Sequence, residues 1–159
     1  MIKNKMLLPL IREVINKLKE AKYFNKLDII WEYNNIWIKE GDKWKAAFSS
    51  NKGLFKSKVM YFRLFNLLGT FQRRMNSIFW KPLHEGVLVN YIDDFIIPAK
   101  SKKELEERTT WFLKIAEKHN LCFKWPKFNF DVEEIPILGV VVGWGEVQTK
   151  NNKVKAVKE

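Results

Sequence analysis

The chain has 159 residues, 47% of them hydrophobic and 30% charged, with 7 glycines and 5 prolines. These values exclude a disordered, collagen-like or low-complexity protein and favour one domain with a buried core. The 29 Lys and Arg outnumber the 18 Asp and Glu for a formal charge of +11, which, with 14% aromatic residues, favours a polyanionic partner over a charge that serves solubility alone.

The first half of the chain alternates between helical and extended patterns. Pro9 is suited to the start of a helix, in which apolar residues recur every three or four positions at Leu10, Val14, Leu18 and Ala21. Extended segments are expected at residues 23–30, 35–39, 43–48 and 51–60. Gly41 and Asp42 are expected to form a hairpin turn between two of these segments. Residues 66–83 carry one apolar stripe and predict a helix.

The second half begins with two short apolar strands, at residues 86–92 and 95–97, separated by Asp93 and Asp94. Ser101 and Glu104 form a capping box, which predicts a helix that continues to about His119. Further strands are expected at 122–130, 135–142 and 146–149, and a basic helix at 153–159. Helices that alternate with antiparallel strands in one small domain indicate an α+β fold.

Cysteine and histidine are too few for a disulfide-bonded or zinc-binding protein. The single Cys cannot form an internal disulfide and, with two His, cannot complete a four-ligand zinc site. No apolar run approaches the roughly 18 residues of a membrane span, and the basic N-terminal segment is interrupted by Pro9 and Arg12. We therefore expect an intracellular protein, of unknown compartment, with no signal peptide and no membrane partner.

Asp93 and Asp94 stand between two apolar strands, where like charges repel each other and lose hydration. A type I′ hairpin turn is one interpretation, because Asp tolerates the positive φ that such a turn needs. A divalent-cation site is the other, because carboxylate oxygens suit Mg²⁺ and the cation offsets the repulsion.

Asp28 favours the metal interpretation. It lies in the extended apolar run 27–30, where a lone buried carboxylate is costly, although exposure at a strand edge is an alternative. Three Asp side chains at neighbouring strand ends would hold two Mg²⁺ about 4 Å apart, as in enzymes that transfer nucleotides. A ferredoxin-like βαββαβ sheet would bring the strands of Asp28 and Asp93 together at its centre.

Five short motifs follow one another along the chain. They are residues 8–11 with 21–24 and Leu27-Asp28, residues 53–55, residues 70–73 with Met75-Asn76, residues 91–94, and residues 137–139 with Gly145. In this order and spacing they resemble the reverse transcriptase of gypsy-type LTR retrotransposons over nearly the whole chain. Residues 91–94 match that family's Tyr-X-Asp-Asp motif without a change.

The resemblance implies a polymerase palm, an α+β fold with a ferredoxin-like antiparallel sheet, helices on one face, incomplete fingers and no thumb. Residues 1–159 would be a partial reverse transcriptase domain, and residues 134–149 a primer-grip-like hairpin within it. The implied activity is RNA-directed DNA polymerisation, and the implied partners are an RNA or DNA template with primer and a dNTP. The remaining polyprotein domains (fingers, thumb, RNase H and integrase) are further candidate partners.

In this family, Asp28 and Asp93 would bind two Mg²⁺ ions, with the carbonyl of Ile29 as a further ligand. Asp94 would complete the acidic cluster. The resemblance thus implies nucleotidyl transfer by these three carboxylates.

The resemblance also implies residues that contact the substrates. Tyr33 matches the aromatic residue beneath the nucleotide sugar, which excludes a ribose 2′-hydroxyl. Phe62 and Gln72 match residues on the nucleotide and template side. Leu138 and Gly139 match the primer grip.

Three positions depart from the family pattern. Glu32 and Arg63 stand where the family has small residues, and Leu68 stands where it has Pro. Glu32 would repel the triphosphate, and Arg63 would prevent a close approach of the backbone. The alternative function is therefore a decayed, non-catalytic nucleic-acid-binding remnant of a retrotransposon polyprotein. A third interpretation, an unrelated basic α+β scaffold, is disfavoured by the ordered motifs.

Overall fold

The computed structural model describes residues 10–29, 34, 36–61, 64, 67–124 and 128–149. Its helices are α1 (Ile11–Lys19), α2 (Leu67–Ile78), α3 (Trp80–His84) and α4 (Lys102–Lys118), with a 3₁₀ helix η1 (Glu40–Ala46). Its strands are β1 (Tyr23–Asp28), β2 (Ala47–Ser50), β3 (Gly53–Lys56), β4 (Val89–Tyr91), β5 (Asp94–Ala99), β6 (Asn129–Val132), β7 (Glu134–Ile137), β8 (Val140–Gly143) and β9 (Glu146–Thr149). None of the helices in these ranges is long and apolar enough to cross a membrane. Pro9 and the expected helix at 153–159 lie outside the described residues.

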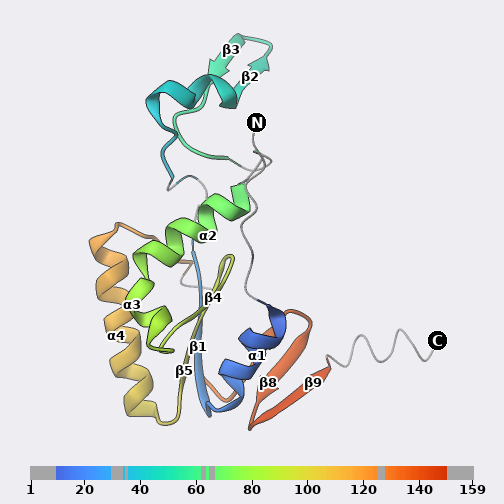
Figure 1. The fold of residues 1–159 in the computed structure, drawn as a ribbon, viewed down its shortest axis with the longest axis vertical. Coiled ribbons are helices and arrows are strands. Elements are labelled where there is room, and N and C mark those ends of the chain that lie inside the picture. The colour runs from blue at the N-terminus through green and yellow to red at the C-terminus, as the bar shows by residue number, and fades with distance from the viewer. Residues whose placement is uncertain are drawn as a thin grey trace, which may run out of the picture.

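A four-stranded antiparallel sheet with the order β4-β5-β1-β6 forms the centre of the fold (Figure 1). Along the chain, β1 is followed by α2 and α3, then by β4 and β5, and then by α4 and β6. This is the βαββαβ order of a ferredoxin-like sheet, so the predicted α+β fold is confirmed.

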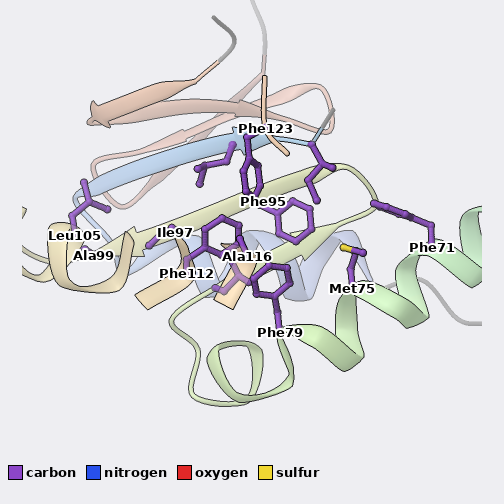
Figure 2. Packing of buried hydrophobic residues seen from close by; sticks show 13 residues of the cluster. Phe71, Met75, Phe79, Phe95, Ile97, Ala99, Leu105, Phe112, Ala116 and Phe123 are labelled. Carbon is purple, nitrogen blue, oxygen red and sulfur yellow. The ribbon is translucent and has the colours of Figure 1, made fainter. Parts of the chain in front are cut away.

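Both crossover segments, α2–α3 and α4, cover the same face of this sheet through a cluster of aromatic side chains. Phe79 stacks on Phe112 with ring centroids 4.7 Å apart, and Phe95 of β5 lies 5.7 Å from Phe112 (Figure 2). Leu27 of β1 and Met75 of α2 are buried in the same cluster. The cluster therefore ties the two central strands to the helices that connect the strands.

α1 and the three-stranded sheet β7-β8-β9 cover the opposite face. Val14 and Leu18 of α1 are buried with Phe24 of β1, Ile96 of β5 and Ile135 of β7. Because side chains alternate across a strand, neighbouring residues of β1 and β5 supply both cores. The expectation of helices on one face thus holds for the crossover helices but not for α1.

The predicted hairpin around residues 41–42 is wrong, because residues 40–46 form η1 and the hairpin is made by β2 and β3. Lys43 pairs with Glu40 and Lys45 pairs with Asp42, three residues apart. This spacing suits a 3₁₀ helix, in which side chains at i and i+3 lie above each other. Every residue of β2 and β3 is exposed, and the hairpin projects beyond the central sheet (Figure 1).

The helix predicted at 66–83 is divided into α2 and α3. Pro82 has no N–H and cannot donate to the carbonyl of Ile78, which lies four residues earlier. The interruption falls at Phe79, whose φ of −100° and ψ of 24° depart from helical values.

Several predicted strands differ from their expected extents; those at 51–60 and 86–92, for example, are reduced to β3 and β4. The segment at 35–39 contributes one bridge, from Trp37 to Val59. The segment at 122–130 contributes a bridge from Phe123 to Ile29, and β6 begins only at residue 129. The segment at 135–142 is a hairpin of β7 and β8, rather than one strand.

α4 lies where the capping box predicts it. The Ser101 side chain accepts a hydrogen bond from the Glu104 backbone N–H at 3.3 Å, and the helix ends at Lys118 with His119 as its C-cap. A buried chain of hydrogen bonds then fixes α4 on the sheet: Asn25 of β1 donates to Thr109 Oγ1 at 2.8 Å and accepts from the Asp131 N–H at 2.7 Å. The polar side chains of Asn25 and Thr109 are thereby satisfied inside the core.

Truncation of the central aromatic side chain should destabilise the fold strongly. We expect Phe112→Ala to lower the free energy of unfolding by about 3–5 kcal/mol, because it removes a fully buried ring and leaves a cavity. Urea unfolding followed by circular dichroism measures the change. Phe130→Ala is the control, because that ring is 47% exposed and its loss should cost far less. Equal effects of the two substitutions would contradict the placement of the core.

Candidate active site

Asp28 and Asp94 face each other across the two central strands. Asp28 is the last residue of β1, Asp94 is the first residue of β5, and their Cα atoms are partners in the antiparallel pairing. Their side chains are 18% and 31% exposed, so both are partly exposed at this end of the sheet, although Asp28 Oδ1 is buried. The register of β1 on β5 thus brings two of the three predicted acidic residues to one place.

Asp93 lies in the tight turn that joins β4 to β5. Tyr91 pairs with Asp94, so Ile92 and Asp93 are the two central residues of the turn. Ile92 has a φ of 58°, whereas Asp93 is not among the described residues with positive φ. The type I′ interpretation is therefore wrong, because that turn needs positive φ at both positions. A β-branched residue in this region is strained, and the surrounding structure must stabilise it.

Gln72 of α2 supplies that support. Its side-chain oxygen accepts a hydrogen bond from the Ile92 backbone N–H at 2.7 Å. Its amide nitrogen donates to Asn76 Oδ1 at 2.9 Å, and Asn90 Nδ2 reaches the same oxygen at 3.5 Å. Gln72 is fully buried, so its position on α2 fixes the backbone of the turn from inside the protein.

Asp93 has a carboxyl group whose pKa is shifted by its surroundings. Partial burial raises the pKa of its carboxyl above the ordinary value, and the charges of Asp94 and Asp28 raise it further. A hydrogen bond to the Asp93 backbone and the charge of Lys26 act in the opposite direction. Asp93 is therefore close enough to Asp94 and Asp28 to be repelled by both.

Two lysines offset this negative charge. Lys26 Nζ lies 2.8 Å from Asp94 Oδ1, and Lys124 Nζ lies 3.8 Å from Asp28 Oδ2. Within the part of the chain that the structure describes, no group of three or more His, Cys, Asp or Glu side chains is arranged to hold a metal ion. The donor set nevertheless fits Mg²⁺ chemically, because it consists of carboxylate oxygens that repel one another in the absence of a cation.

The other predicted site residues lie in different surroundings. The Ile29 side chain is fully buried in the aromatic cluster, which leaves only its backbone for contacts with a ligand. Leu138 and Gly139 form the turn between β7 and β8, with φ values of 50° and 87°. Tyr33 and Phe62 lie outside the described residues.

Sequence reasoning missed Lys26, and it included Asn76 in a motif without giving it a role. Lys26 stands two residues before Asp28, and the period of two along a strand places both side chains on one face of the sheet. Asn76 follows Gln72 by four residues, on the same side of α2. Both spacings are visible in the sequence and were the available signals.

The model of the family described as "Reverse transcriptase (RNA-dependent DNA polymerase)" matches residues 1–142. The Pol polyprotein from transposon 297 of Drosophila melanogaster is 34% identical over 151 residues, which cover 94% of this chain and 14% of that protein. The Pol polyprotein from transposon gypsy of the same organism is 28% identical over 152 residues, which cover 96% of this chain and 15% of that protein. The chain thus spans about a seventh of these relatives.

Solved structures show the same fold at low identity. The foamy viral protease-reverse transcriptase in complex with an RNA/DNA hybrid matches 99% of this chain and 21% of that chain, with a TM-score of 0.85 and 13% identity. A second foamy viral structure, in complex with double-stranded DNA, matches 100% of this chain and 28% of that chain, with a TM-score of 0.89 and 13% identity.

Removal of the Asp93 charge should stabilise the protein at neutral pH. Asp93→Asn is expected to raise the free energy of unfolding at pH 7 by roughly 0.5 kcal/mol, since the ionised form is disfavoured at this partly buried position. In the wild type, ionised Asp93 lowers the free energy of unfolding. This loss is absent below the ordinary pKa of 3.8 and is complete once the pH has risen through the raised pKa of the folded state. Urea unfolding at pH 4 and pH 7 measures the difference, which should be smaller at pH 4.

Asp42→Asn is the matched control for that comparison. A hydrogen bond from Lys45 and the charge of Lys45 lower the pKa of Asp42, so this substitution should bring no stabilisation at pH 7. Equal gains from the two variants would contradict the proposed repulsion within the acidic cluster.

Proposed function

The chain belongs to the reverse transcriptase family, and we propose that it forms the palm of an RNA-directed DNA polymerase in which Asp28, Asp93 and Asp94 hold two Mg²⁺ ions. The observation that supports this most directly is the strand register, which sets Asp28 opposite Asp94 with Asp93 in the adjoining turn. When bound, the ions supply the charge neutralisation and hydroxyl activation of nucleotidyl transfer.

The chain's own residues position this chemistry. Gln72 holds the Ile92 N–H and so fixes the turn that carries Asp93. Lys124 donates its backbone N–H to the carbonyl of Asp28 at 3.0 Å, which restrains the end of β1. Because phosphoryl transfer depends mainly on positioning and charge, these restraints would orient the carboxylates toward the reacting phosphate.

Contacts with the substrates are part of the same proposal. The Ile29 carbonyl would serve as a further metal ligand, and Tyr33 and Phe62 would line the nucleotide. Gln72 would act on the nucleotide and template side through the turn rather than by direct contact, since it is fully buried. Leu138 and Gly139 would contact the primer.

The partners that we propose are an RNA or DNA template with its primer and a dNTP. Under this proposal residues 1–159 form a partial reverse transcriptase domain, with residues 134–149 as the primer-grip hairpin. The relatives are polyproteins of which this chain spans about a seventh, so we propose that full activity also requires other polyprotein domains.

A second candidate is a nucleic-acid-binding remnant without turnover. The pairing of Lys26 with Asp94 favours it, because a cation already neutralises one of the three carboxylates. Glu32, Arg63 and Leu68, which depart from the family pattern, favour it as well.

Primer extension on an RNA template with Mg²⁺ separates the two candidates. We expect incorporation by this chain to be barely detectable, because Glu32 and Arg63 would hinder the triphosphate, and to be lost completely in Asp93→Asn. Asp42→Asn, which alters an exposed carboxylate of η1, should leave the rate unchanged. Template binding without any Asp93-dependent incorporation would favour the remnant.

Nucleic-acid binding should depend steeply on salt and little on sequence. The formal charge of +11 displaces counterions from phosphates, so affinity should fall severalfold or more between about 50 and about 200 mM salt. Fluorescence anisotropy with labelled template–primers of different sequence measures both properties. Affinity that does not respond to salt would show that the charge serves only solubility.

A further inference from the structure

Lys26 places a positive charge within the acidic cluster of Asp28, Asp93 and Asp94. It stands on the same face of β1 as Asp28, and its ammonium group lies 2.8 Å from Asp94 Oδ1. Only 18% of the Lys26 side chain is exposed, so the pair is partly shielded from water and from salt. This is a closer contact than the one between Lys124 and Asp28, at 3.8 Å.

The same ammonium group also contacts β7. Lys26 Nζ donates a hydrogen bond to the carbonyl of Pro136 at 3.3 Å. Pro136 pairs with Val141 in the β7–β8 hairpin, whose turn is formed by Leu138 and Gly139. Lys26 therefore links the acidic end of the central sheet to this hairpin.

An ammonium group and a divalent cation bound through Asp94 require the same carboxylate. We propose that Lys26 is a built-in counter-ion of Asp94, which a divalent cation must displace before Asp94 can serve as a metal ligand. This inference rests on the proposed function, because it assumes that the acidic cluster binds divalent cations.

Two arrangements of the site follow from this competition. Without metal, Lys26 holds Asp94 and Pro136 together and offsets the repulsion among the carboxylates. With metal, the ammonium group leaves Asp94, and the link from the acidic cluster to β7 is broken. Lys26 is thus a positioning residue that lowers the affinity of the cluster for divalent cations.

Binding of Mn²⁺, measured by the loss of the electron paramagnetic resonance signal of the free ion, tests the proposal without an activity assay. Lys26→Met retains the apolar stem and removes the charge, and it should bind Mn²⁺ about fivefold more tightly than the wild type. Lys26→Arg retains a positive charge and should bind no more tightly than the wild type. Circular dichroism confirms that each variant is folded.

Two controls test the specificity of the effect. Lys22→Met removes the same charge from an exposed position at the other end of β1 and should leave the affinity unchanged. In an Asp94→Asn background, Lys26→Met should no longer increase the affinity, because the competing carboxylate is absent.

The outcomes separate this proposal from the proposed function. Tight binding by Lys26→Met together with weaker binding by the wild type supports both. Equal binding by the two proteins, or a gain that persists with Asp94→Asn, overturns the role of Lys26 and leaves the metal site intact. No binding by any of these proteins contradicts the metal-dependent function and Lys26 competition together.

Discussion

The antiparallel pairing of β1 with β5 is the constraint on which the rest of the structure depends. It sets Asp28 opposite Asp94, and both strands supply alternate side chains to two different cores. A shift of one residue would exchange the faces, which would bury Lys26 and Asp28 among the aromatic rings and remove Leu27 from them. This register is therefore stabilised by apolar packing on both faces of the sheet. The aromatic cluster packs on one face, and α1 with β7-β8-β9 packs on the other.

Polar residues inside the protein complete the positioning. Asn25 connects β1 to α4 and β6, while Gln72 connects α2 to the turn at Ile92. Each of these side chains exchanges hydrogen bonds to water for hydrogen bonds to specific partners. These bonds favour one packing of the helices on the sheet over similar alternatives. The hydrogen bond from the Ile92 N–H to Gln72 maintains the positive φ of Ile92; without this bond, the turn would adopt a less strained backbone conformation.

Local signals allowed much of the fold to be predicted. The position of α4 follows from Ser101, Glu104 and a regular apolar stripe, which lie within one segment. Predictions were less accurate where one residue changes the local geometry, as Pro82 does between α2 and α3. For the site, the three Asp residues could be named, but the contacts of Lys26 with Asp94 and Pro136 join residues far apart in the chain. The two-residue period gives the face of Lys26, but its partners depend on how the layers pack.

The exposed hairpin of β2 and β3 has a consequence for how this protein can change during evolution. Since neither strand buries a side chain, the hairpin adds little to the folding free energy, and substitutions there leave the central sheet intact. Selection on the hairpin would then act through its contacts with other molecules, rather than through the stability of the fold. The central strands have no such freedom, because their apolar residues serve one core or the other and their charged residues form the acidic site. The fold should therefore restrict sequence change in β1 and β5, whereas in the hairpin, which includes the motif at residues 53–55, change would be restricted by contacts outside the fold.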